Sequence, residues 1–472
     1  MLRRLSRNLG LAGLLLALVA FVTPTARSAD ILINNGAHRA VLMSGGAITA
    51  AASVDHTTTQ ALQSWEQFTA TGLATQFDST GKLTYRPNNL LTYSNTFSNA
   101  AWTKTLATVA SGVSDPFGGT NAWTLTATGG GAQLYQSVSL ASGTTALATV
   151  WMRRRTGSGN IGIYQYTGGT FSLPTISPTG SWQQFTVVQT PTTGSGALNI
   201  QLNASGDAVD IYLGALSAVT YETSPRSADQ VITTSAAYYG PRFDYTSAAV
   251  ALGLINEPIA ATNIARQNRD LTNAAWTKTN ITAAKTQTGI DGVANSASLI
   301  TASAANGAVL QTVTLASSQR FQSAYVKRVT GSGVVNMTTD GGATWTAITV
   351  TGSYTRVSIP AQTVTNPSFG FQIVTNGDAI AVDFVQNETG SEWSSPIAVA
   401  AAAVTRAPES LVFSGYASNP YAILSAPEST GSFACNKYAN QAAANAAIAA
   451  ANQWVKTIKI WPVGTPSGSQ TC

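Results

Sequence analysis

The sequence predicts a mainly β protein with two tandem antiparallel jelly-roll β-sandwiches, a small N-terminal attachment segment and a C-terminal α/β extension. The first observation is an internal repeat. Residues 99–105 recur letter for letter as residues 273–279, so Trp276 follows Trp102 by 276 − 102 = 174 positions. A period this long indicates two whole domains rather than turns of a solenoid. The second is composition: only 10% of the 472 residues are charged and 41 are glycine, which is typical of many short strands and turns.

The third observation is the strand pattern within each copy, at residues 88–228 and 263–406. Short alternating segments are separated by Gly, Ser, Asn and Asp, and helical periodicity is absent. The predicted strands are 145–152, 182–188, 198–202 and 209–213 in the first repeat, and 320–327, 354–359, 368–374 and 379–385 in the second. Two stacked antiparallel sheets are the economical fold for this pattern.

Residues 1–29 have the layout of a secretory signal peptide, with a basic start, an apolar stretch at 9–22 and small residues up to Ala29. An uncleaved anchor is the alternative, although the apolar stretch is shorter than the roughly 20 residues that span a bilayer. The attachment segment, residues 30–87, shows short β-like pieces and a helix around 58–68. Its apolar content is too thin for a core of its own, so we expect it to pack on a partner or on the first repeat.

The linker, residues 229–262, is aromatic enough that we expect it to be ordered. In the extension, residues 407–472, the Ala-rich stretch 437–455 predicts a helix and residues 458–461 a final strand. Cys435 and Cys472 are the only cysteines. In an exported chain a single pair is most simply a disulfide that contributes roughly 4 kcal/mol, and two free thiols are the alternative.

Several classes of chemistry are disfavoured. The net charge of +5 comes from scattered Lys and Arg, so we expect no nucleic-acid partner. The two histidines, His38 and His56, lie outside the repeats and are interpreted as exposed loop residues, which argues against a catalytic triad or a histidine metal site. Phosphate-loop and dinucleotide motifs are absent from the sequence. We therefore predict no catalytic residues and no cofactor beyond structural Ca²⁺.

Four aspartates are the weak Ca²⁺ candidates. The repeat places Asp207 and Asp210 opposite Asp378 and Asp383, all where a turn enters a strand. Aspartate at such a place most often caps its own turn, while Ca²⁺ ligation and catalysis by paired carboxylates are the two alternatives.

Aromatic residues are the most suggestive class for binding sugar rings. The matched pairs Trp102/Trp276, Trp151/Tyr325 and Trp182/Tyr354 favour a shared structural role. Tyr164 and Tyr166 alternate along a strand with Ile161 and Ile163, and we predict them as the exposed ligand-binding residues.

Part of the amino-acid sequence resembles that of a known protein family. Residues 89–104 (NLLTYSNTFSNAAWTK) look like the opening of the carbohydrate-binding-module-like jelly-roll domains of tailed-phage and prophage fibre, head-spike and tail proteins. Residues 240–245 and 252–257 resemble the join before such a domain, and the resemblance covers about residues 68–406. It implies a virion-associated, trimeric, non-enzymatic fibre or spike that touches bacterial surface glycans, with no catalytic residues to transfer.

We therefore predict a glycan-contacting homo-oligomer, located on a virion or outside the cell. Its partners are bacterial surface polysaccharide and, through the N-terminal segment, other virion or surface proteins. The leader and the cysteine pair leave room for an exported bacterial adhesin. A structural spacer is another alternative and should lack an exposed aromatic cluster. A glycan-degrading enzyme, which is less favoured, should show two carboxyl groups facing each other across about 5–10 Å.

Overall fold

The computed structural model describes residues 32–35, 38–41 and 48–472, apart from positions 142, 164, 168–169, 173, 193 and 429. It separates into a first unit, Met1–Ala51, and a second unit, Ala52–Cys472. In the first unit, β1 (Leu32–Asn35) pairs antiparallel with β2 (His38–Val41). The predicted leader lies outside the described residues. Within the described part of the chain, no helix is long and apolar enough to cross a bilayer.

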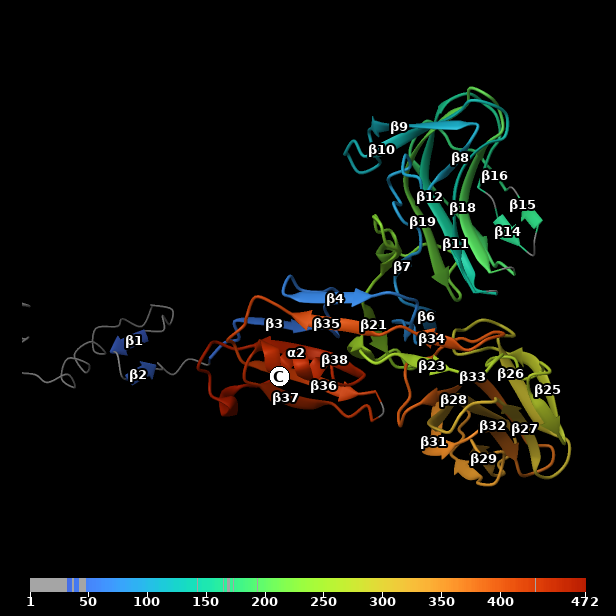
Figure 1. Ribbon diagram of the computed structural model, residues 1–472, viewed down its shortest axis with the longest axis vertical. Helices are drawn as coiled ribbons and strands as arrows, with labels where there is room; N and C mark the ends of the chain where they lie inside the picture. The colour runs from blue at the N-terminus through green and yellow to red at the C-terminus, as the bar shows by residue number, and fades with distance from the viewer. Residues whose placement is uncertain are drawn as a thin grey trace, which may run out of the picture. The chain divides into compact units, whose positions relative to one another are not determined.

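The first repeat is a sandwich of two five-stranded antiparallel sheets, coloured cyan to green in Figure 1. The β12 sheet has the order β17-β12-β19-β10-β9, with bounds β9 (Ala107–Val113), β10 (Ala122–Ala127), β12 (Thr145–Thr156), β17 (Gln183–Gln189) and β19 (Ala208–Val219). The opposite sheet has the order β16-β13-β18-β11-β8, with bounds β8 (Thr103–Thr105), β11 (Ala132–Ser139), β13 (Ile161–Ile163), β16 (Thr175–Ile176) and β18 (Ser195–Leu202).

The second repeat, yellow to orange in Figure 1, has the same topology strand for strand. Its β28 sheet has the order β25-β26-β33-β28-β31, with bounds β25 (Ile281–Gln287), β26 (Ala297–Ala302), β28 (Ser318–Thr330), β31 (Thr355–Val364) and β33 (Ala379–Thr389). The opposite sheet contains β24 (Thr277–Thr279), β27 (Gly307–Thr312), β32 (Ser368–Ile373), β29 (Val335–Thr338) and β30 (Thr346–Ile348). The predicted mainly β fold with two antiparallel sandwiches is confirmed.

The repeated sequence at 99–105 and 273–279 stabilises the local structure of each repeat. Trp102 and Trp276 are each 1% exposed inside their sandwich, and their indole N–H groups donate to backbone carbonyls, at 2.9 Å to Tyr93 in the first repeat. The ammonium groups of Lys104 and Lys278 each donate to four carbonyls of the preceding turn. The repeated sequence thus buries one tryptophan ring and supplies hydrogen-bond donors to the backbone carbonyls of the preceding turn. These two contacts explain why both repeats retain it.

A third core, which we call the C-terminal body, is assembled from three distant segments. Its sheet has the order β21-β22-β38-β36-β37, and β3 pairs with the far part of β38; the bounds are β3 (Ala52–Asp55), β21 (Arg242–Tyr245), β22 (Ala251–Asn256), β36 (Tyr421–Pro427), β37 (Ala434–Tyr438) and β38 (Gln453–Ile460). β4 (Glu66–Ala70) pairs with β35 (Glu409–Phe413). Residues 52–70 of the attachment segment therefore pack on the extension and the linker, which we did not predict. Leu73 and Tyr85 of the same segment pack against the core of the first repeat, in agreement with our expectation.

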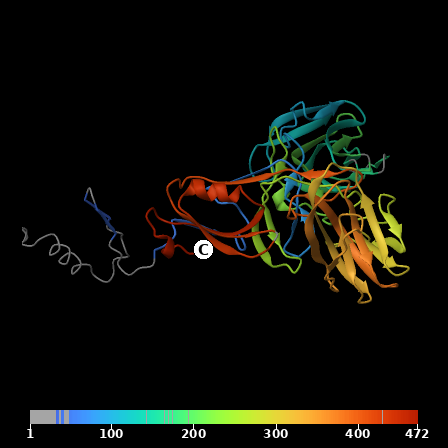
Figure 2. The ribbon, with the colours of Figure 1, turned by 60° about the horizontal axis from the view of Figure 1, so that its bottom comes forward.

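The helix of this body is shorter than predicted. Helix α2 runs only over Gln441–Ile448, and Figure 2 shows it in red beside the strands of this body. Its buried residues Ala444 and Ile448 belong to the core of the C-terminal body. Asn440 caps its start by accepting the amide of Ala443 at 2.9 Å. At the ends of the predicted helix, residues 437–438 belong to β37 and 453–455 to β38, because pairing with β36 satisfies their backbone; the residues between these strands and α2 form turns. The predicted helix at 58–68 is wrong: turns there lead into β4.

Cys435 of β37 and Cys472 form a disulfide, with Cα atoms 5.8 Å apart. The remaining elements are two-stranded pairs and short turns that connect the three cores. They are β5 (Thr75–Phe77) with β6 (Leu83–Tyr85), β7 (Asn88–Asn89) with β20 (Tyr238–Tyr239), β23 (Ala261–Asn263) with β34 (Val404–Arg406), β14 (Gln165–Thr167) with β15 (Thr170–Ser172), and 3-10 turns η2 (Ser227–Asp229) and η3 (Ser467–Ser469).

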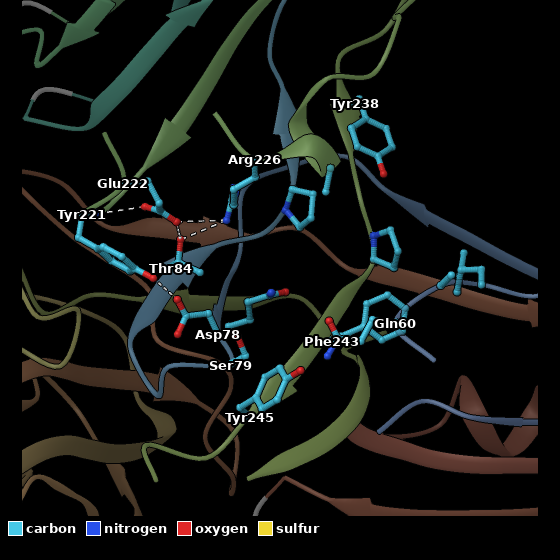
Figure 3. A pocket seen from close by; sticks show the side chains of 16 residues that line it. Gln60, Asp78, Ser79, Thr84, Tyr221, Glu222, Arg226, Tyr238, Phe243 and Tyr245 are labelled. Carbon is cyan, nitrogen blue, oxygen red and sulfur yellow. Dashed lines mark hydrogen bonds and ion pairs between the residues drawn. The ribbon is translucent and has the colours of Figure 1, made fainter. Parts of the chain in front are cut away.

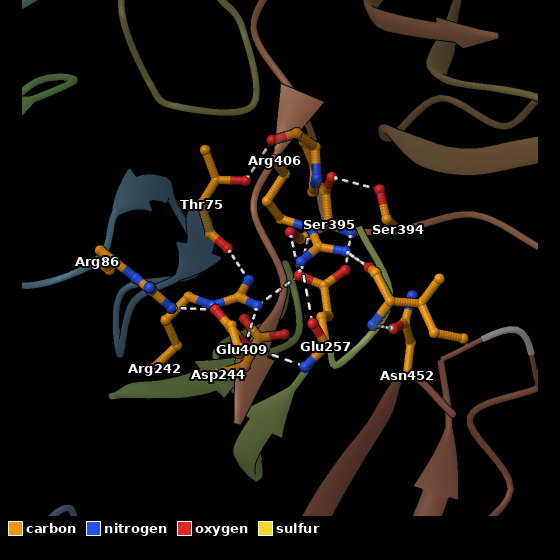
Figure 4. Close-up of polar contacts among 12 residues, drawn as sticks. Thr75, Arg86, Arg242, Asp244, Glu257, Ser394, Ser395, Arg406, Glu409 and Asn452 are labelled. Atoms are coloured by element: carbon orange, nitrogen blue, oxygen red, sulfur yellow. Dashed lines mark hydrogen bonds and ion pairs between the residues drawn. The ribbon is translucent and has the colours of Figure 1, made fainter. Parts of the chain in front are cut away.

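A buried ionic network fixes the C-terminal body to the second repeat (Figure 4). Arg242 is fully buried and donates to Glu409 at 2.8 and 2.9 Å, to the carbonyl of Thr75 at 2.6 Å, and to Glu257. Glu257 also accepts the amide and hydroxyl of Ser395, both at 2.7 Å. Burial raises the pKa of Glu257, but Arg406 and Arg242 outweigh burial and lower it to about 2.

Candidate functional site

Four aromatic side chains gather on the face of the β12 sheet that points away from the sandwich core; we call them the aromatic shelf: Phe117, Trp151, Trp182 and Tyr212. Strand alternation places them there. Val150 and Met152 point into the core, so Trp151 between them points outward. Trp151 lies directly opposite Tyr212 of β19 in the strand pairing. The shelf therefore stands on the two longest strands of the repeat.

Phe117 is held over this surface by a turn between β9 and β10. The carboxylate of Asp115 accepts the backbone N–H groups of Phe117 and Gly119, both at 2.9 Å. Burial raises the pKa of Asp115, and these backbone hydrogen bonds together outweigh it, so the pKa lies below its ordinary value. The Phe117 ring meets Trp151 edge-on at 5.5 Å and is itself 70% exposed. The carboxylate of Asp115 thus holds the turn that keeps the Phe117 ring exposed to solvent.

A pocket of about 420 Å³ lies against the shelf, within the usual size range of small-molecule sites. Phe117, Trp151 and Tyr212 form its apolar wall. Gln184 and Gln230 form a polar side and are hydrogen-bonded to each other at 3.1 Å, while Nε2 of Gln230 has no protein partner. Flat apolar rings beside free amide groups suit a ligand that has both an apolar face and hydroxyl groups.

The same face exists in the second repeat but is covered. The strand register makes Tyr325 the counterpart of Trp151, and it packs with Phe384 and Ile290 against Phe77 and Leu83 of the β5–β6 hairpin. The rings of Phe77 and Tyr325 are 5.9 Å apart, and these residues are 7% and 8% exposed. One copy of the aromatic face is therefore closed by the protein's own hairpin, while the other keeps an exposed ring.

The predicted binding residues are not located by the structure. Tyr164 lies outside the described residues. Tyr166 belongs by its backbone to β14, which pairs with β15, and its side chain also lies outside the description. Their role stays a prediction. Of the matched pairs, Trp102/Trp276 has the structural role we predicted, whereas Trp151 and Trp182 belong to the shelf. Phe117 was missed; its signal is the turn sequence at 115–119 (DPFGG), which has no aromatic counterpart after Asp291.

The four candidate Ca²⁺ ligands are each paired with arginine. Asp207 faces Arg154 at 3.4 Å, Asp378 faces Arg328 at 3.5 Å, and Asp383 binds Arg269 at 2.7 Å. Asp210 binds both Arg153 and Arg155 at 2.8 and 2.7 Å. In each case a guanidinium group occupies the side from which a cation would be ligated. Throughout the described ranges, no group of three or more His, Cys, Asp or Glu side chains is arranged to hold a metal ion.

The predicted equivalence of Asp210 and Asp383 is wrong. Asp210 pairs with Arg153 across the strands, and its counterpart in the second repeat is Ala381, which pairs with Lys327. Asp383 instead corresponds to Tyr212. The offset between the repeats is 174 at Trp151 and Tyr325 but 383 − 212 = 171 further along, so sequence spacing alone misaligned the two aspartates.

A larger pocket of about 670 Å³ contains two carboxylates, Asp78 and Glu222 (Figure 3). Asp78 accepts the amide of Thr80 at 2.8 Å and the hydroxyl of Tyr221. Burial raises its pKa, but these hydrogen bonds together lower it below the ordinary value. Glu222 accepts the hydroxyl of Thr84 and pairs with Arg226 at 3.3 Å. A hydrolytic general acid needs a raised pKa, and Asp78 has the opposite. These contacts build a turn rather than an acid–base pair.

Of the two histidines, His56 is buried rather than exposed and bonds Glu66 at 2.8 Å, and the side chain of His38 lies outside the description. His56 does lie in a turn, but the interpretation that it is exposed is wrong. Its second ring nitrogen faces the carbonyl of Thr59 at 3.4 Å. Both nitrogens are thus engaged inside the C-terminal body, which gives His56 a structural role there.

Comparisons with known proteins find similar chains among solved structures. No protein-family model matches the chain, and no curated protein matches it. Among solved structures, the xylan-binding CBM22-1 domain of Paenibacillus barcinonensis Xyn10C is similar at 12% identity over 26% of this chain and 87% of that one, with a TM-score of 0.22. The tandem CBM22-1-CBM22-2 domain of the same protein is similar at 10% identity over 70% of this chain and 99% of that one, with a TM-score of 0.24. The structural neighbours are thus carbohydrate-binding modules, while the phage part of the predicted resemblance stays a prediction.

Proposed function

We propose that this protein is a non-enzymatic glycan-binding protein and that the aromatic shelf of the first repeat is its binding surface. The observation that carries the proposal is the contrast between the two copies. The second repeat buries this face under Phe77 and Leu83, whereas the first keeps Phe117 70% exposed beside Trp151. A fixed and exposed aromatic ring costs solubility, so its retention in one copy supports a ligand.

The chemistry of the shelf suits a sugar ring. The apolar C–H face of a pyranose packs on Phe117 and Trp151, and the hydroxyl groups reach Gln184 and Gln230. Such a site is shallow and binds weakly on its own. A homo-oligomer, most simply a trimer, would multiply it by raising the effective concentration of the second and third contacts.

For the setting we propose a virion or the exterior of a bacterium, with the polysaccharide of a bacterial surface as ligand. The N-terminal segment would attach the chain to other virion or surface proteins. An exported adhesin uses the same surface for the same chemistry. A pure spacer is disfavoured because it has no use for an exposed Phe117.

Binding of the full chain to an array of bacterial polysaccharides tests the proposal. The variants are Phe117→Ala with Trp151→Ala, and Tyr164→Ala with Tyr166→Ala as a separate arm. Val334→Ser, at a side chain 52% exposed on the second repeat, is the matched control. Binding that Phe117→Ala/Trp151→Ala abolishes and Val334→Ser leaves intact supports the shelf. Binding lost only in the tyrosine variant moves the site to 164–166, and no binding by the folded protein favours the spacer.

A further inference from the structure

A second pocket, which we call the junction pocket, has a volume of about 300 Å³ and is lined by three parts of the chain. The hairpin contributes Phe77, the C-terminal body contributes Asp244 and Glu428, and the second repeat contributes Tyr354 and Arg356. Asp244 and Ser395, two of its wall residues, are labelled beside the buried network in Figure 4. The exposed residues Ser247 and Thr355 also line it, so the pocket reaches solvent.

Unpaired polar atoms converge on this pocket. Glu428 is 3% exposed, yet its Oε1 has no hydrogen-bond partner. The hydroxyl of Tyr354, Nε of Arg356 and Oε1 of Gln76 are also buried without a partner. Four of the sixteen such atoms in the described residues thus belong to residues that line this pocket, although buried polar groups are normally paired; one of the four residues, Gln76, also lines the larger pocket. The set includes donors and acceptors together.

The charged side chains that line the junction pocket restrict the net charge of a ligand that it can bind. The guanidinium of Arg356 lies over the rings of Trp393 at 5.0 Å and Tyr325 at 5.6 Å, which fixes its positive charge at the pocket and disfavours a cation. Asp244 places a carboxylate in the same wall, which disfavours an anion, and Glu428 adds a carboxyl group that can both donate and accept a hydrogen bond when it is protonated. Burial raises the pKa of Glu428 well above its ordinary value, and neighbouring Glu257 raises it further. A neutral molecule with several hydroxyl groups is left as the ligand that can satisfy both donors and acceptors.

We propose that the junction pocket binds a neutral polyhydroxylated ring of monosaccharide size, packed against Phe77, Tyr325 and Trp393 and hydrogen-bonded by Glu428, Tyr354 and Arg356. This site is separate from the aromatic shelf and does not depend on it. Because its walls come from three parts of the chain, a bound ligand would tie the hairpin and the C-terminal body to the second repeat. Binding here therefore stabilises the folded chain.

Thermal-shift titration of the full chain with glucose, galactose, xylose and N-acetylglucosamine, up to roughly 50 mM for a weak one-ring ligand, tests the proposal. Tyr354→Phe deletes one unpaired hydroxyl with little change in shape. Tyr421→Phe is the matched control, because its hydroxyl is likewise buried without a partner but lies in the core of the C-terminal body. Isothermal calorimetry then gives Kd for each variant, and Phe117→Ala separates this site from the shelf.

We expect saturable binding of at least one sugar, weakened about fivefold or more by Tyr354→Phe and by Glu428→Gln, since one hydrogen bond of ordinary strength is worth that factor. Tyr421→Phe should leave Kd unchanged, and the binding that remains in Phe117→Ala should still be weakened by Tyr354→Phe. Two results would overturn the proposal: no saturable shift with any of the four sugars, or equal affinity in Tyr354→Phe. Stabilisation by sodium acetate or by calcium chloride in place of sugar would also overturn it, because the ligand would then be charged.

Discussion

Tyr212 of the first repeat and Asp383 of the second occupy the same position in their sheets, each paired across the strands with the outward aromatic residue of the neighbouring strand, Trp151 or Tyr325. The two residues act differently. Tyr212 contacts Phe117 at 5.9 Å and extends the open shelf. Asp383 is buried, binds Arg269 at 2.7 Å and accepts the amide of Ile290 at 3.0 Å. That pairing holds Ile290 in the cluster that the hairpin covers, so this difference between the repeats contributes to closing the second face.

Removing the ring of Phe77 should therefore lower the free energy of unfolding more than removing the ring of Phe117. Phe77→Ala deletes a ring buried against Tyr325, and we expect a loss of about 3 kcal/mol in the free energy of unfolding. Phe117→Ala deletes an exposed ring and should change stability by less than about 0.5 kcal/mol. Urea unfolding of both variants measures this. Comparable losses would mean that the shelf is a structural surface rather than a binding one.

Sequence reasoning succeeded where the cause of the structure is local. The repeated sequence at 99–105 predicted two similar domains, because its Trp and Lys make the same local contacts with backbone carbonyls in both copies. Alternation and turn residues predicted four of the ten strands in the two sheets of each sandwich for the same reason. The C-terminal body was not predictable in this way. Its β4 and β35 lie more than 300 residues apart in the chain, and neither segment shows its partner in its own pattern.

The binding face was missed for a related reason. Conserved spacing between the copies directed attention to what both share, such as Trp102 and Trp276, which are core residues. The open surface depends on what they do not share: Phe117 in its turn, and Tyr212 where the second copy has Asp383. Tyr325, the counterpart of Trp151 in the second repeat, is covered by a hairpin at 75–85 that precedes both repeats.

The ionic network around Arg242 should be essential to the C-terminal body. Arg242→Met leaves Glu257 and Glu409 buried without their shared partner, and we expect a loss of about 3–5 kcal/mol. Lys285→Met is the control, because Lys285 meets Asp270 at 3.8 Å with its side chain 41% exposed, and it should cost less than about 0.5 kcal/mol. Chemical denaturation measures both. A loss below 1 kcal/mol for Arg242→Met would show that other groups or water neutralise the two glutamates.

Asp244 should make the folded chain more stable at mildly acidic pH. Burial raises the pKa of Asp244 from 3.8 to about 6, although the N–H of Trp454 partly offsets the effect. Between these values the folded chain holds a proton that the unfolded chain has released. The stability from this group is therefore fully present below about pH 4 and is lost as pH rises through about 6. We expect the free energy of unfolding to be about 1 kcal/mol higher at pH 5 than at pH 7 from this group alone.

Urea unfolding at pH 5 and pH 7 tests this in the parent chain and in Asp244→Asn, which cannot titrate. The difference between the two pH values should shrink by about 1 kcal/mol in the variant. Glu428, whose pKa burial also raises, stays in both proteins and cancels from the comparison. An unchanged difference would assign the pH dependence to Glu428 and other groups.

The repeated sequence Thr-Gly-Ser-Gly at 156–159 and 330–333 should depend on an aspartate rather than on glycine flexibility alone. Gly331 has φ +78°, and a Cβ there would lie 1.8 Å from Oδ1 of Asp378; Gly157 and Asp207 repeat the geometry. Gly377 has a similar φ of +83° but nothing within 4 Å of such a Cβ. Gly377→Ala should therefore cost only the backbone strain, about 1 kcal/mol, and Gly331→Ala about 1–3 kcal/mol more.

A double-mutant cycle with Asp378→Ala isolates that contact. Removing the carboxylate frees the space beside position 331, although it also deletes the bond that Asp378 accepts from the amide of Gly333 at 2.7 Å. We expect the double variant to be more stable than the sum of the single losses by at least about 1 kcal/mol. Additive losses would mean that the left-handed backbone alone requires glycine at 331. In that case the role of Asp378 at this turn would be to accept the amide of Gly333 and to pair with Arg328.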